Sequence, residues 1–220
     1  MLESLTNPEE RLLDPMERIS EVLFALIMVL TFTCSFSVAG AGHEEVRTML
    51  LGALGCNLAW GIIDAVFYLM GCFSASGRRI LTLGALRRAS SKEESLRIIA
   101  NVLPPLLVSV LSTSDLETIR ERLGNVRDIS ERPQLEKRDW LGAVRVFLIV
   151  VVSILPVIVP FALLANVRSA LRVSNTIAVI MLFVTGYAFG KHAGHRPWTM
   201  AVAMVLLGGT MVGITISLGG

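Results

Sequence analysis

The stretch MLLGALGCNLAWGIIDAVFYLMGCF, from Met49 to Phe73, is almost entirely apolar but carries one acidic residue, Asp64, near its middle. A transmembrane helix needs about 20 apolar residues, so this stretch is long enough to cross a bilayer. An ionised carboxylate there costs roughly 2.5–3.5 kcal/mol even on lenient insertion scales, and such groups usually face protein or water. Four polar, aromatic or small residues share helical spacing with it: Asn57, Trp60, Gly61 and Tyr68. We therefore expect this face of the helix to point away from lipid.

The composition of the whole chain indicates an integral membrane protein. Of its 220 residues 53% are hydrophobic, and the mean hydropathy is +0.66, which soluble domains seldom reach. The three cysteines, Cys34, Cys56 and Cys72, lie in or beside apolar segments and imply no disulfide framework. The N-terminus is polar and acidic before its first apolar run, unlike a cleaved secretory signal.

The apolar runs predict an all-α integral membrane protein with five transmembrane helices and a small helical cytoplasmic domain between the second and third. The expected spans are Val22–Val38, Met49–Phe73, Leu141–Leu164, Val173–Gly190 and Trp198–Leu218. The chain accordingly divides into residues 1–73 (N-terminal tail and first two spans), 74–139 (cytoplasmic domain) and 140–220 (last three spans).

Local sequence signals refine this outline. The prolines Pro156 and Pro160 predict a kink in the outer half of the third span. Two short helices of the polar segment are expected to begin at capping boxes, at Ser91-Lys92-Glu93-Glu94 and Ser114-Asp115-Leu116-Glu117. The apolar run Ile98–Leu111 between them is too short to span, and its Pro104-Pro105 pair interrupts it, so it indicates a domain core or an interfacial segment.

The distribution of basic residues predicts the orientation. The 74–139 segment holds twelve Lys and Arg, and five more are expected on the same side: Arg11, Arg18, Arg145, Lys191 and Arg196. Only Arg47, Arg168 and Arg172 would lie opposite. Because basic residues concentrate in cytoplasmic loops, we expect the N-terminus and residues 74–139 in the cytoplasm and the C-terminus outside. The expected location is the bacterial cytoplasmic (inner) membrane.

The acidic residues suggest a path for divalent cations. Carboxylates suit hard or borderline ions such as Mn²⁺ and Fe²⁺, and a thioether adds some preference for softer ones. The candidate metal ligands are Glu17, Glu21, Met28, Asn57, Asp64, Glu93, Glu94, Glu117 and Glu121. Other roles stay open: Glu17 as a helix cap, Met28 as packing, and the four glutamates of the polar segment as solvated helix faces and caps. Asp64 is the strongest candidate, because carboxylates within the membrane are usually functional.

Catalysis is not expected from this sequence. The three histidines, His43, His192 and His195, all lie near span ends, and no GxSxG, HExxH, phosphate-loop or CxxC motif is present. We therefore expect neither an enzyme nor a bound cofactor, and no nucleic-acid partner.

The chain resembles the vacuolar iron transporter family in a short bacterial-type form. The resemblance rests on the acidic start of the first span (Glu17-Arg18-Ile19-Ser20-Glu21), the Gly/Ala-rich second span, Leu155-Pro156-Val157-Ile158-Val159-Pro160-Phe161 in the third, and Leu206-Leu207-Gly208-Gly209 in the last. It implies five spans, a helical cytoplasmic domain, and a dimeric, proton-coupled exporter of Fe²⁺ or related ions. Family members carry Asp-Gly in the middle of the first span, whereas the matching residues here, Ala25–Val29, contain no acid. In the second span, family members usually carry a Met at or near the position of Asp64.

Two functional hypotheses follow. The first is a homodimeric divalent metal–proton antiporter, exporting Fe²⁺ or Mn²⁺ across the bilayer. In it Glu17 and Glu21 attract the cation, and Asp64 binds it with Asn57 and Met28. The second is a non-transporting membrane adaptor that binds a protein partner through residues 74–139. A transporter for another small solute is a third alternative.

Overall fold

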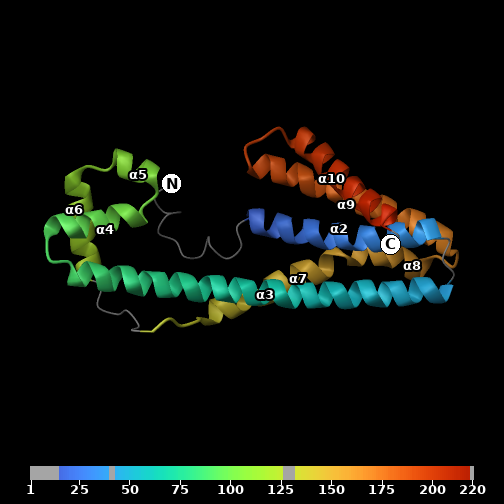
Figure 1. Ribbon diagram of the computed structural model, residues 1–220, viewed down its shortest axis with the longest axis horizontal. Coiled ribbons are helices and arrows are strands. Elements are labelled where there is room, and N and C mark those ends of the chain that lie inside the picture. The colour runs from blue at the N-terminus through green and yellow to red at the C-terminus, as the bar shows by residue number, and fades with distance from the viewer. Residues whose placement is uncertain (1–14, 40–42, 126–131, 219–220) are drawn as a thin grey trace. The chain divides into compact units, whose positions relative to one another are not determined.

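The computed structural model is all-helical in the part it describes, which is residues 15–39, 43–125 and 132–218, with backbone alone at 15–18, 35–39 and 43 (Figure 1). The helices are α2 (Pro15–Ala39), α3 (His43–Arg88), α4 (Lys92–Val102), α5 (Pro105–Val110), α6 (Thr113–Gly124), α7 (Lys137–Ser153), α8 (Leu155–Leu163), α9 (Val167–His192) and α10 (Pro197–Ser217). They form two compact units: Met1–Tyr68 with Trp140–Gly220, and Leu69–Asp139. We call these the helical bundle and the polar unit.

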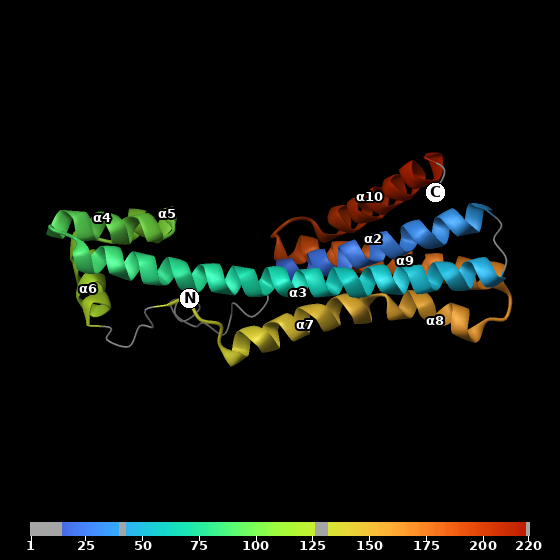
Figure 2. The same ribbon diagram turned by 60° about the horizontal axis from the view of Figure 1, so that its bottom comes forward.

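Helix α9 is the centre of the bundle, packing against α2, α8 and α10 (Figures 1 and 2). The buried core joins α2, α8 and α9 with α7 and consists of Ala25, Leu26, Val29, Leu30, Val150, Ile154, Val157, Ala178 and Leu182, while Val205 and Val212 of α10 pack against it. Helices α9 and α10 approach closely because Gly186 and Gly190 lack side chains: a Cβ on Gly186 would lie 2.8 Å from the carbonyl oxygen of Met200. Small residues permit such close approach where lipid supplies no hydrophobic driving force.

Helix α3 is 46 residues long, about 69 Å at about 1.5 Å per residue, and continues well past the expected end of the second span at Phe73. In the bundle it packs on α2 through the rings of Phe24 and Trp60, whose centroids are 5.9 Å apart. It packs on α7 at two glycines. A Cβ on Gly61 would lie 3.1 Å from Phe147, and a Cβ on Gly142 would collide with the ring of Tyr68.

The proline kink predicted in the third span is present as a break between α7 and α8. Ile154 is the N-cap of α8, and the backbone N–H groups of Val157 and Ile158 both donate to its carbonyl. Pro156 has no N–H to continue the α7 ladder, so the helix restarts there. The hydroxyl of Ser174 on α9 donates to the carbonyl of Val157 at 2.7 Å, which joins α8 to α9 just after the interruption.

Within the described residues, four helical segments are long and apolar enough to cross a membrane: Glu44–Arg88, Lys137–Leu163 (α7 and α8 together), Val167–His192 and Pro197–Ser217. The first apolar run, Ile19–Cys34, falls below that length in the part whose side chains are described. The integral membrane class is confirmed, whereas the count of five spans stays a prediction.

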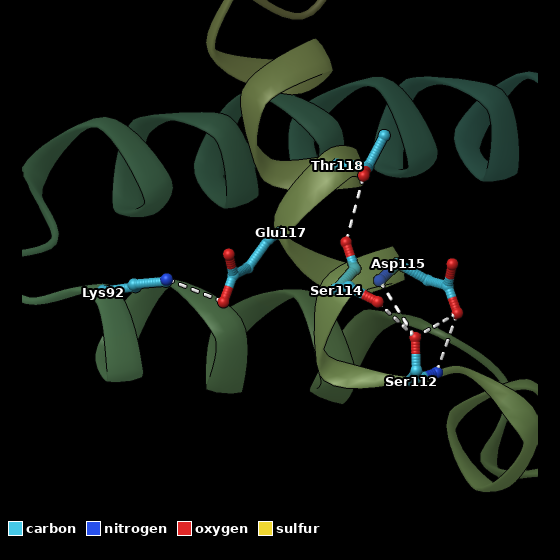
Figure 3. Close-up of polar contacts among 6 residues, drawn as sticks. All are labelled: Lys92, Ser112, Ser114, Asp115, Glu117 and Thr118. Atoms are coloured by element: carbon cyan, nitrogen blue, oxygen red, sulfur yellow. Dashed lines mark hydrogen bonds and ion pairs between the residues drawn. The ribbon is translucent and has the colours of Figure 1, made fainter.

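The polar unit contains the end of α3 together with α4, α5 and α6. Lys92 on α4 forms an ion pair with Glu117 on α6 at 2.7 Å (Figure 3). Ser91 caps α4 as predicted, since its Oγ accepts from the N–H of Glu94 at 3.1 Å, but the reciprocal half of the predicted box differs, because Glu94 accepts from Ser90 instead of Ser91. The second capping prediction was wrong by two residues, because α6 begins after Ser112. Ser112 and Asp115 bond each other reciprocally in a full capping box, while the Ser114 carbonyl accepts from Thr118 (Figure 3).

Candidate functional site

The inward side of α3 carries two buried polar residues whose hydrogen-bonding atoms have no partner. Asn57 is 1% exposed and Asp64 is 8% exposed. Both amide atoms of Asn57 and Oδ2 of Asp64 are shielded from solvent, and none has a hydrogen-bond partner within the described structure. The expectation was that Asp64 faces protein or water and not lipid, and its burial within the bundle agrees with this.

Helical periodicity places these two residues on one face of α3. Val46, Met49 and Ala53 are buried on the same helix, and Asn57 and Asp64 continue that face at spacings of four and seven residues. Gly61 lies between them and receives Phe147 and Val150 of α7. The absence of a side chain at Gly61 lets α7 approach, so the polar face is covered by protein.

Three buried hydroxyl groups of the bundle are satisfied, those of Thr33, Ser153 and Ser174. Thr33 donates to the carbonyl of Val29 at 3.1 Å, and Ser153 donates to that of Val150 at 2.7 Å. Ser174 reaches across to α8 and bonds the carbonyl of Val157. Asn57 and Asp64 therefore stand apart from the hydroxyl residues, which bond to nearby carbonyls as Ser and Thr commonly do in helices.

Leaving such groups unpaired is costly. A buried donor or acceptor without a partner costs about 1–3 kcal/mol, and more when it is charged. Native proteins leave few such groups, and each one calls for an explanation, such as a functional role or a bound water or ion. One carboxylate and one amide oxygen, two turns apart on a shielded face, can accept a cation, a proton or water hydrogens.

A third unpaired group was missed from the sequence. Oδ1 of Asn175 on α9 is shielded from solvent and has no partner within the described residues, while its neighbour Ser174 is fully satisfied. The available signal was a lone amide within the apolar run Val173–Gly190.

The candidate ligands of the first span lie on α2. The side chain of Glu17 lies outside the described residues. Glu21 is partly buried, with Oε2 shielded from solvent. Met28 packs against the core of the bundle. Packing was the alternative to a ligand role that the sequence analysis left open for this residue. A metal role for these residues stays a prediction.

The four glutamates of the polar unit are already engaged or solvent-exposed. Glu93 is exposed, and Glu117 pairs with Lys92. The backbone N–H of Ser90, and then its hydroxyl, donate to Glu94 and hold the pKa of that carboxyl below its ordinary value. Glu121 is exposed and lines a cavity of the polar unit. Among the side chains that the structure describes, no three His, Cys, Asp or Glu gather at one point that could hold a metal ion.

Comparison with known proteins gives the chain its family. The family model described as the VIT family matches residues 105–220, more than half of the chain. No curated protein matches the sequence. The matched residues begin at α5, so they contain Glu117 and Glu121 but neither Asn57 nor Asp64. Members of this family are transporters, and membership favours transport over the adaptor hypothesis. The chain belongs to the VIT family, the vacuolar iron transporters.

Proposed function

We propose that the chain transports a divalent metal cation, Fe²⁺ or Mn²⁺, and that Asp64 is the group that binds it within the membrane. The observation that carries this proposal is the solvent-shielded Oδ2 of Asp64, which has no partner in the described part of the chain and lies on a helix long enough to span a bilayer. A carboxylate kept in that position without a fixed partner is suited to a transient charged one.

The ligand set supports a hard or borderline ion. Oxygen ligands favour cations such as Mn²⁺, and the amide oxygen of Asn57, two turns away on the same face, offers a second oxygen along the pathway. One carboxylate does not fill an octahedral shell, so water or a second chain completes it. A homodimer that pairs two copies of Asp64 at one pathway is part of this proposal, because isologous two-fold pairing brings identical residues together.

Proton coupling follows from the same carboxylate. Protonation of Asp64 removes the charge that holds the cation, so one group exchanges H⁺ for the metal ion. The proposed direction is export, with the cation entering from the cytoplasmic side near Glu21 and leaving where protons are offered outside. The excess of basic residues in residues 74–139 supports that orientation.

Metal flux in proteoliposomes tests the proposal. Protein reconstituted with an internal divalent-ion indicator is driven by a pH gradient, with Mn²⁺ or Fe²⁺ supplied outside. We expect Asp64→Asn, which removes the charge but keeps the shape, to lower the initial rate at least about tenfold, the loss expected when a charged ligand is removed. Glu44→Gln is the matched control, an exposed carboxylate on the same helix, and keeps the wild-type rate. Wild-type flux in Asp64→Asn would refute the mechanism.

A further inference from the structure

The polar unit contains a cavity of about 500 Å³ whose lining is more basic than acidic. Its walls come from the end of α3 and the turn after it, the first half of α4, and the end of α6. The lining residues are Leu83, Leu86, Arg87, Ala89, Ser95, Arg120, Glu121, Leu123, Gly124 and Asn125. Two guanidinium groups therefore share it with one carboxylate.

Arg120 is the unusual member of this lining. It is partly buried, and its Nε is shielded from solvent and has no hydrogen-bond partner among the residues that the structure describes. Two ion pairs of the polar unit join Lys92 to Glu117 and Arg138 to Glu136, and neither uses Arg120. A guanidinium is always charged and presents its donors as a rigid fork, so among the described residues this cation lacks a counter-ion.

The chemistry of an occupant follows from that fork. Two parallel N–H groups of an arginine match two oxygens of a phosphate or carboxylate, and such charge-assisted bonds are roughly twice as strong as neutral ones. The cavity volume exceeds what one phosphate needs and lies in the range of small-molecule sites. We propose that this cavity binds a phosphate-bearing anion through Arg120 and Arg87, independently of the cation site on α3.

A purely structural role for Arg87 and Arg120 predicts a different result. Arg87 lies in the last turn of α3, where a cation offsets the helix dipole, and Arg120 lies one turn before the end of α6, where its stem packs in the polar unit. If this were their whole function, replacing either would lower thermal stability, and phosphate would have no specific effect on the wild-type protein.

The test uses the full chain in phosphatidylcholine nanodiscs. Inorganic phosphate is titrated against sodium chloride of equal ionic strength, while thermal unfolding and calorimetric binding are measured. We expect phosphate to raise the unfolding temperature and to bind at least about tenfold more weakly to Arg120→Gln and Arg87→Gln. Arg122→Gln is the matched control, an exposed arginine on α6 outside the cavity, and keeps wild-type affinity. Arg120→Lys keeps the positive charge but loses the guanidinium fork, so its affinity for phosphate should lie between those of the wild type and Arg120→Gln.

A second arm separates a soluble ligand from a lipid headgroup. In this arm, nanodiscs containing phosphatidic acid replace free phosphate. If phosphatidic acid raises the unfolding temperature only when Arg120 is present, and free phosphate has no effect, the site binds a lipid headgroup. The proposal is overturned if neither source gives an Arg120-dependent shift, or if Arg122→Gln weakens binding as much as Arg120→Gln does.

Discussion

The carboxylates of the two units of this chain differ sharply in their surroundings. In the polar unit, Glu94 and Asp115 are solvent-exposed, and each accepts hydrogen bonds from a serine at a helix start. In the bundle, Asp64 is 8% exposed and its Oδ2 has no partner within the described residues. The carboxylates of Glu94 and Asp115 stabilise the starts of helices. The carboxylate of Asp64 stabilises no element of the fold, and its burial lowers the stability of the protein.

This contrast separates structural acids from a functional one. Capping carboxylates lower the free energy of the fold and need no ligand to be satisfied. An unpaired buried carboxylate raises it and is completed only by something that arrives, such as a cation or a proton. Replacing each kind of residue should therefore change stability with opposite signs.

The largest effect on stability is expected where α7 covers the polar face of α3. Gly142→Val inserts a side chain into the ring of Tyr68, and overpacking of this kind costs about 1–3 kcal/mol. Thermal unfolding in detergent should show a clear fall in midpoint. Gly52→Val is the matched control, because a Cβ added to this glycine of α3 would meet no atom within 4 Å.

A double substitution sharpens that result. If the collision with Tyr68 is the cause, Tyr68→Ala combined with Gly142→Val recovers part of the loss, giving a coupling energy between the two sites. Equal losses in the single and double variants would show that the tight contact between α3 and α7 is not where the protein is sensitive.

The next prediction is an increase in stability, caused by replacing a buried amide of the bundle. Asn57→Leu replaces an unpaired buried amide with an apolar group of similar size, so it should stabilise the protein by about 1–3 kcal/mol while lowering metal flux. Ser174→Ala, which removes a satisfied bond to Val157, should instead destabilise by about 1 kcal/mol. Parallel unfolding and flux measurements check both. A destabilised Asn57→Leu would mean that this amide has a structural partner.

Loss of a helix cap is expected to be of similar or smaller size. Ser112→Ala removes the hydroxyl that bonds Asp115 at the start of α6, and such changes typically cost about 1 kcal/mol. Hydrogen exchange of the α6 amides should quicken, with flux unchanged. Thr118→Ala, which removes a bond to a carbonyl within the helix, should leave the α6 start intact.

The smallest effect is a response to acid confined to the polar unit. The hydroxyl and then the backbone N–H of Ser112 hold the pKa of Asp115 below its ordinary value, and hydrogen bonds from Ser90 likewise lower the pKa of Glu94. A carboxylate with a lowered folded-state pKa stabilises above its unfolded value, about 3.9 for Asp, and loses that contribution as pH falls through the folded value. The hydrogen-exchange protection factors of the amides at the α4 and α6 starts, which correct for the intrinsic effect of pH on exchange, should stay constant from pH 7 to 5 and fall only below about pH 4. A fall in these protection factors already between about pH 7 and 5 would contradict this assignment.

The sequence predicted those features that depend on local chemistry or on a single unusual residue. The burial of Asp64, the break near Pro156 and the cap at Ser91 were all predicted and confirmed. The start of α6 was misplaced because Ser112 and Ser114 both precede an acid by three residues, and only the folded chain shows that Asp115 bonds Ser112. Asn175 was missed because nothing local shows that its amide oxygen lies unpaired in the bundle.

The length of α3 marks another limit of prediction from sequence. Hydropathy ends the span near Phe73, but the helix runs on to Arg88, since the arginines, leucines and alanines of residues 74–88 have good helix propensity and continue the backbone ladder. Helix bounds and membrane bounds are separate quantities, which is also why the number of spans stays a prediction while the helices of the bundle are defined.

The most direct test of the account is to locate the metal. Crystals or frozen particles of the full chain with Mn²⁺, compared with Asp64→Asn, show whether the ion meets this carboxylate. We predict a metal peak about 2.0–2.6 Å from a carboxylate oxygen of Asp64, the range for hard divalent cations, and its loss in the variant. A well-ordered Asp64 bonded to a fixed protein partner, with Mn²⁺ bound elsewhere or with the same peak in Asp64→Asn, would contradict the claim.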